Sequence, residues 1–181
     1  MGVPESLRFT YEDYLLTSDD RRYELVDGDL FLTPAPTPNH QQIAGELFAR
    51  LREFVEGQRL GRVVIAPCDV VLSRYDVVQP DVFFVRAERL SIIGEKNIQG
   101  APDLVIEVLS PSTEERDRQM KAKLYARSGV RELWIVDPAA KTIELYAGSG
   151  AAFRRVALFT IADTVRSAVL PGLEISLALV F

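Results

Sequence analysis

One carboxylate interrupts an apolar run of this sequence. Residues 104–109 read Leu-Val-Ile-Glu-Val-Leu and are bounded by Pro102 and by Ser110-Pro111, a pattern that predicts a buried central strand carrying Glu107. A buried carboxylate is costly unless a metal ion, a buried cation or several hydrogen bonds compensate it. Glu107 is therefore the first candidate for a chemical role.

A second acid, Asp81, stands at the start of another predicted buried strand. Residues 80–85 read Pro-Asp-Val-Phe-Phe-Val. Two carboxylates that converge on neighbouring strands form an oxygen-rich site, which suits Mg²⁺ or Mn²⁺. Asp81 and Glu107 are therefore candidate metal ligands.

The helix predicted to follow the Glu107 strand carries a lysine on its apolar side. Ser112 and Glu115 fit a capping box, and Gly129 is placed to end the helix, so we expect it to span about residues 112–128. At about 100° per residue, Lys121 falls within an apolar stripe, and a lysine in such a stripe is unusual. Because the helix packs back onto the sheet it follows, we expect Lys121 to be a buried partner of Glu107.

Two interpretations of these residues compete. In the first, Lys121 forms a surface pair with Asp117, worth a few tenths of a kcal/mol, and Glu107 is merely hydrogen-bonded. In the second, Asp81 and Glu107 hold a divalent metal ion and Lys121 acts on a water molecule, which are the parts of metal-assisted phosphodiester hydrolysis.

The remaining elements indicate an α/β fold. We expect a hairpin over residues 22–32 around Asp27-Gly28, a helix over 39–57 with His40 in its first turn, and strands over 63–72, 130–136 and 173–181. Residues 75–79 are expected to be a connection. A helix between the strands at 104–109 and 130–136 predicts a parallel pair. The hairpin and a second antiparallel pair, expected over residues 143–147 and 153–159, make the sheet mixed.

Composition narrows the class of protein. The chain has 181 residues, a net charge of −5 and a pI near 5.0, so we expect one domain over residues 1–181 and little non-specific attraction to nucleic acid through overall charge. The sequence shows no apolar run of membrane-spanning length and no signal-peptide pattern. Its one cysteine, Cys68, is expected to be a small core residue. These features favour a cytoplasmic protein.

Several motifs, in this order, resemble the Uma2 family over about residues 8–180. They are Tyr23-Glu-Leu-Val-Asp-Gly28, His40, Pro80-Asp81, the segment 102–110, Asp117…Lys121…Tyr125, Gly129-Val130 and Leu133-Trp-Ile-Val-Asp-Pro138. The resemblance implies the restriction-endonuclease-like fold, a mixed central β-sheet flanked by helices, with the PD-(D/E)xK nuclease signature.

The resemblance also implies roles for individual residues. It makes Asp81 and Glu107 metal-binding acids and Glu24 a weaker further member of the site. The signature places a lysine two residues after the acid, where this chain has Leu109, and the resemblance suggests that Lys121 has taken over that role.

The resulting hypothesis is a metal-dependent endonuclease. Mg²⁺ or Mn²⁺ is expected to bind Asp81, Glu107 and the backbone carbonyl of Val108, while Lys121 positions a water molecule that attacks a phosphodiester in DNA. A homodimer suits the cutting of two strands. Asp103, near the start of the Glu107 strand, is expected to stabilise a turn or loop instead.

Three alternatives stay open on the sequence alone. The chain could be a binding module that kept the fold without turnover, an assembly protein with a buried Glu107–Lys121 ion pair, or a nuclease acting on RNA or unusual DNA ends. A basic rim around the acids would favour a nuclease over a binding module, and the candidates for that rim are Arg50, Arg52, Lys96, Arg116 and Arg118.

Overall fold

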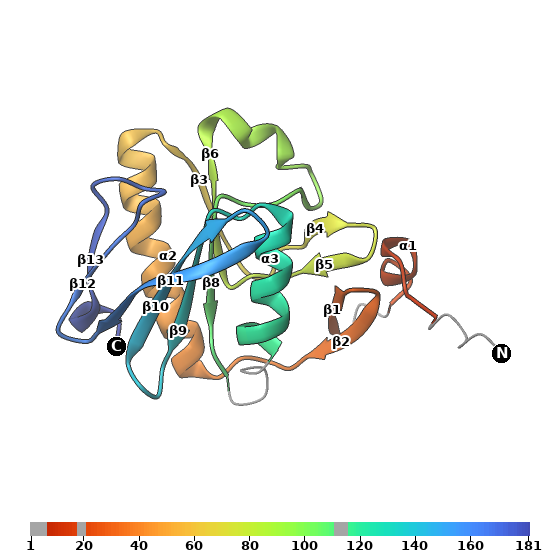
Figure 1. Ribbon diagram of the computed structural model, residues 1–181, viewed down its shortest axis with the longest axis horizontal. Coiled ribbons are helices and arrows are strands. Elements are labelled where there is room, and N and C mark those ends of the chain that lie inside the picture. The colour runs from red at the N-terminus through yellow and green to blue at the C-terminus, as the bar shows by residue number, and fades with distance from the viewer. Residues whose placement is uncertain (1–6, 18–20, 111–115) are drawn as a thin grey trace.

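The computed structural model describes residues 7–17, 21–110 and 116–181, with the backbone alone for Arg116 and Asp117. Figure 1 shows a central sheet between helices, with a smaller sheet beside it. The elements, in chain order, are α1 (Tyr11–Tyr14), β1 (Arg22–Val26), β2 (Asp29–Thr33), α2 (Pro38–Gln58), β3 (Gly61–Ile65), β4 (Val70–Ser73), β5 (Asp76–Val78), β6 (Val82–Arg86), η1 (Ala87–Ile92), β7 (Ile98–Gln99), β8 (Leu104–Val108), η2 (Arg116–Lys121), α3 (Ala122–Ser128), β9 (Glu132–Asp137), β10 (Thr142–Ser149), β11 (Ala152–Thr160), β12 (Thr164–Arg166), β13 (Glu174–Ser176) and η3 (Leu177–Leu179).

A six-stranded mixed sheet forms the centre of the molecule. Its strand order is β11-β10-β9-β8-β6-β3. The pair β8–β9 is parallel and the other pairs are antiparallel. The predicted β-α-β unit is therefore confirmed, and so is the mixed α/β class.

The helix α2 covers one face of this sheet. Thr37 caps it, since its side chain accepts a hydrogen bond from the backbone N–H of His40, and Pro38 occupies the first turn, where no intrahelical donor is needed. Its apolar stripe packs on alternate strand residues that include Ile106, Val108 and Trp134. The cap holds the first turn of α2 at the carboxyl end of β8.

The helix α3 covers the other face. Leu124 and Tyr125 are buried against strand residues of opposite parity, such as Val105 and Leu133. The sheet face that carries Glu107 is this one, because side chains alternate along a strand. Before α3, η2 is a π-helical turn, a feature that is frequent at functional sites.

A five-stranded sheet, β2-β1-β5-β4-β7, lies beside the α3 layer. Its β1–β2 hairpin turns at Asp27 and Gly28, which both have positive φ, as a two-residue turn of this kind requires. The hairpin was predicted correctly, and it carries Glu24 on β1.

Three predicted elements were wrong. Residues 63–72 form two strands, β3 and β4, which belong to different sheets. Residues 75–79 include β5 rather than a plain connection. The segment 173–181 holds only the short strand β13, which pairs with β12 and gives way to a 3₁₀ turn. The capping box of Ser112 and Glu115 lies outside the described residues.

No helix within the described ranges combines the length and apolarity that a bilayer span requires.

Candidate active site

The pairing of β6 with β8 brings the two acids together. Val82 lies opposite Ile106 in this antiparallel pair, so the register, continued by one residue, places Asp81 opposite Glu107. Directly opposed side chains lie on the same face of a sheet. The backbone N–H of Val108 donates a hydrogen bond to Asp81 Oδ2 at 2.7 Å, which holds the Asp81 carboxylate against the end of β8.

Glu107 is only 2% exposed and is compensated by two side chains from the helical layer. Lys121 Nζ lies 3.2 Å from Glu107 Oε1. The Tyr125 hydroxyl donates to the same oxygen at 2.5 Å. The predicted contact between Glu107 and Lys121 is therefore present, and Lys121, 3% exposed, is not the surface residue of the competing interpretation. The side chain of Asp117 is not described.

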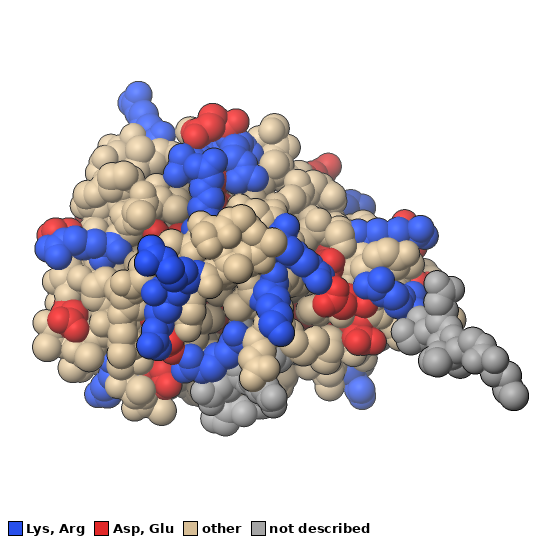
Figure 2. Space-filling view, in the orientation of Figure 1, with Lys and Arg blue, Asp and Glu red and all other residues tan. Residues whose placement is uncertain are grey.

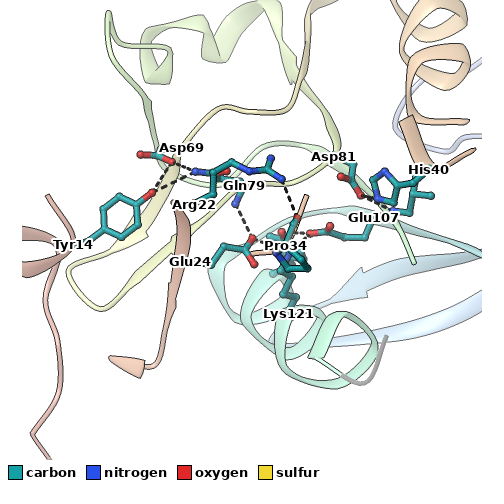
Figure 3. A network of polar contacts seen from close by, with 12 residues as sticks. Tyr14, Arg22, Glu24, Pro34, His40, Asp69, Gln79, Asp81, Glu107 and Lys121 are labelled. Carbon is teal, nitrogen blue, oxygen red and sulfur yellow. Dashed lines mark hydrogen bonds and ion pairs between the residues drawn. The ribbon is translucent and has the colours of Figure 1, made fainter. Parts of the chain in front are cut away.

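Glu24 supplies a second carboxylate to Lys121. Its Oε1 lies 2.8 Å from Lys121 Nζ and accepts the backbone N–H of Gln79 at 2.9 Å. Figure 3 shows Glu24 and Glu107 reaching Lys121 from different elements, β1 and β8. The ammonium group is thus held between two buried carboxylates.

A further network supports Gln79. Its side-chain Nε2 donates to Asp69 Oδ1 at 2.8 Å, and the Tyr14 hydroxyl donates to the same oxygen at 2.9 Å (Figure 3). Burial, and then the neighbouring Asp69, raise the pKa of the Tyr14 hydroxyl above its usual value, so Tyr14 stays protonated and donates. This network connects α1 and the turn before β4 to Glu24.

His40 meets the site from the first turn of α2. Its Nε2 lies 3.3 Å from Asp81 Oδ2, and the ring is buried. This contact with Asp81 makes His40 a polar group of the site and not a packing residue alone.

Most of these groups line one cavity of about 770 Å³, but Tyr14, Asp69 and Tyr125 do not. The residues that could take part in chemistry or binding there are Arg21, Arg22, Glu24, His40, Gln79, Asp81, Glu107, Val108, Ser110 and Lys121. The other walls are residues 32–37, between β2 and α2, together with Gln41, Ala66 and Pro67.

The oxygen donors of the cavity fit a hard divalent cation. Among the residues that the structure describes, no three His, Cys, Asp or Glu side chains cluster as a metal site, so the protein would contribute two carboxylates and a backbone carbonyl. In an extended strand the N–H and C=O of one residue point to the same side. The N–H of Val108 points to Asp81, so its carbonyl is directed to that side as well. A small set of oxygen ligands, completed by water, is typical of Mg²⁺.

Asp103 lies at the opposite end of β8 and stabilises a loop junction, as expected. It is fully buried, accepts the backbone N–H of Arg86, and lies within 4 Å of the Arg86, Arg89 and Arg131 side chains. It does not line the cavity.

Four candidates for a basic rim do not line the cavity: Arg50, Arg52, Lys96 and Arg118. Arg50 and Arg52 pair with Glu46 and Glu56 along α2, and the cavity is lined instead by Arg21 and Arg22. Arg118 pairs with Glu144 and Asp137. The side chain of Arg116 is not described.

Known proteins resemble this chain in sequence and fold. Residues 10–178 match the profile of the Uma2 family, whose description is "Putative restriction endonuclease". The uncharacterized protein slr1290 of Synechocystis sp. is 29% identical over 143 residues, which are 75% of this chain and 72% of that protein. The crystal structure of "a putative nuclease belonging to DUF820" from Anabaena variabilis has a TM-score of 0.81 at 20% identity, with 96% of this chain and 97% of that chain covered. The two structures therefore share a fold.

Proposed function

The chain belongs to the Uma2 family, and from that membership and the geometry of the cavity we propose that it is a metal-dependent endonuclease hydrolysing phosphodiester bonds in DNA. The family match confirms the resemblance drawn from the motifs. The nuclease description of the Anabaena variabilis protein supports the proposal for this chain.

Asp81, Glu107 and the Val108 carbonyl are the groups that would hold Mg²⁺ or Mn²⁺. When bound there, the metal ion would lower the pKa of a coordinated water molecule and offset charge on the phosphate oxygens. Glu107 keeps its place because Tyr125 and Lys121 both donate to its Oε1. Asp81 keeps its place through the Val108 N–H and the adjacent His40 ring.

Lys121 has the role of orienting the attacking water. Glu24 and Glu107 lie 2.8 and 3.2 Å from its ammonium group, so the position of that group is fixed before a substrate binds. Such preorganisation contributes to the rate because less reordering is needed in the transition state. In this proposal Glu24 acts through Lys121 and is a positioning residue.

One observation carries the proposal. Asp81 and Glu107, from antiparallel neighbours β6 and β8, line the same cavity, and Lys121 lies in contact with Glu107. This arrangement supplies two metal-binding acids and a cation, although the lysine comes from a helix rather than from the strand.

Nuclease assays test the proposal directly. Plasmid and single-stranded DNA are incubated with wild type, Glu107→Gln and Asp81→Asn in Mg²⁺, Mn²⁺ and EDTA. We expect cleavage by wild type in either metal, none in EDTA, and a loss of at least 10²-fold in both variants. Glu56→Gln, which removes a surface acid paired with Arg52, is the matched control and should keep full activity. Metal-dependent cleavage that survives in both site variants contradicts the assignment.

A further inference from the structure

We propose that the cavity takes unpaired nucleotides, so that the substrate is a single strand or an unpaired end rather than an intact duplex. This inference rests on the proposed nuclease function and deepens it by naming the form of the nucleic acid.

The depth of the acidic groups is the first argument. Glu24, Glu107 and Lys121 are 1%, 2% and 3% exposed, and the Asp81 side chain is 18% exposed. A phosphate can reach Glu107 only by entering the cavity. In a duplex the phosphates lie on the outside of a rigid cylinder, whereas the backbone of an unpaired strand can bend inward.

The size of the cavity is the second argument. A cube of 770 Å³ has an edge of about 9 Å. A B-DNA duplex is wider than that, since its major groove alone is about 12 Å wide. The volume falls within the range of small-molecule pockets, about 300–1,000 Å³. It therefore suits one or two nucleotides and not a double helix.

The lining of the cavity is the third argument. Residues 32–37, Leu-Thr-Pro-Ala-Pro-Thr, form one wall, and Ala66 and Pro67 add apolar surface. The Arg22 guanidinium donates to the carbonyl of Pro34 at 3.1 Å (Figure 3), which ties this wall to β1. Proline and leucine side chains can pack on the face of an unstacked base, and Thr33, Gln41 and Gln79 carry hydrogen-bonding groups for its edge.

The distribution of cations is the fourth argument. Arg21 and Arg22 line the cavity. Their two guanidinium groups can make about two contacts with phosphate groups. Figure 2 shows further Lys and Arg side chains over the face that carries α3 and β11, with acidic side chains beside several of them. Arg118, Arg127 and Arg155 are each engaged in ion pairs, so the charge of these three side chains on that face is already compensated.

These contacts predict a weak salt dependence. For single strands the slope of log K against log salt is about −0.7 per phosphate contact, so two contacts give a slope of about −1.4. A protein that grips six phosphates of a duplex would show a slope of about −5.

Fluorescence anisotropy tests the inference. The probes are a labelled DNA strand of about 12 nucleotides, within the range of single-strand binding sites, the same strand in a blunt duplex, and a duplex with a short unpaired 3′ end. The linkages are phosphorothioates, which slow hydrolysis, and the buffer contains Mg²⁺. Cleavage of the unmodified probes is measured in parallel. Arg21→Ala tests the cavity cation, and Arg52→Ala, on the exposed surface of α2, is the matched control.

We expect the single strand and the unpaired end to bind at least tenfold more tightly than the blunt duplex, with a salt slope near −1.4. Arg21→Ala should weaken binding about threefold to tenfold and reduce the slope, while Arg52→Ala should change neither. Equal or tighter binding and cleavage of the blunt duplex would overturn this inference and leave the nuclease proposal standing. If no probe is bound or cleaved, the nuclease proposal itself is overturned.

Discussion

The substitution Lys121→Met removes the cation that two buried carboxylates share. Lys121 Nζ lies 2.8 Å from Glu24 and 3.2 Å from Glu107, and all three residues are at most 3% exposed. Methionine fills a similar volume, so the change isolates the loss of charge. We expect the variant to be strongly destabilised.

The magnitude follows from the burial of the pair. Removing one partner of a buried ion pair costs about 3–5 kcal/mol, because the other charge stays buried without compensation. In a chain of this length each kcal/mol lowers Tm by about 2–4 °C. Lys121→Met should therefore lower Tm by about 6–20 °C. Adding Glu24→Gln to Lys121→Met removes one of the two carboxylates that have lost the ammonium group. The double variant should therefore regain part of the lost stability.

Urea and thermal unfolding, followed by circular dichroism, measure this prediction. Lys123→Met is the matched control, since Lys123 is an exposed residue of the same helix, and its effect should stay within about 0.5 kcal/mol. A loss of less than about 1 kcal/mol in Lys121→Met would refute the view that the ammonium group compensates Glu24 and Glu107.

Three other predictions concern stability. Tyr125→Phe removes a hydroxyl that donates to Glu107 at 2.5 Å and should cost about 1.5–3 kcal/mol in urea unfolding. Burial opposes the ionisation of Glu144, but hydrogen bonds from neighbouring arginine and tyrosine side chains outweigh it and lower its pKa to about 2 from 4.5. Its contribution is therefore fully present above about pH 4.5 and is lost as the pH falls toward 2; after allowance for solvent screening we expect wild type to lose about 1–2 kcal/mol more than Glu144→Gln across that window. Asp103→Asn, at the far end of β8, should cost about 3 kcal/mol yet leave any stabilisation by Mn²⁺ unchanged in thermal unfolding.

The contact between Glu107 and Lys121 was accessible from local sequence patterns. A lone acid in an apolar strand, and a lysine in an apolar helical stripe, both break the usual pattern of burial. Because the helix follows the strand directly, their contact could be predicted. Asp81 was also a candidate because it stands at the start of a predicted buried strand, whereas the restriction-endonuclease-like fold came from the family resemblance.

Long-range contacts were not accessible in the same way. Glu24 and Gln79 are 55 residues apart in the chain, and their hydrogen bond depends on how two sheets pack. The role of Tyr125 was missed because an aromatic residue on a buried stripe looks like ordinary packing, although its hydroxyl needs a partner when buried. A tyrosine four residues after the buried lysine was the available signal.

The misassigned strands have a physical cause as well. Residues 63–72 are interrupted by Pro67 and Asp69, but nothing local indicates that β3 joins the six-stranded sheet while β4 joins the other. The strands β12 and β13 have three residues each, too few for a periodic pattern to stand out.

The central claim is that Asp81 and Glu107 bind a divalent metal ion, and thermal unfolding in Mn²⁺ tests it most directly. At ten times its Kd, a ligand of the native state stabilises it by about 1.4 kcal/mol, or about 3–6 °C here. The account predicts this rise for wild type and for the control Glu56→Gln, and none for Asp81→Asn or Glu107→Gln. The account is contradicted if saturating Mn²⁺ leaves the Tm of wild type unchanged, or if it raises the Tm of the two site variants as much as that of wild type.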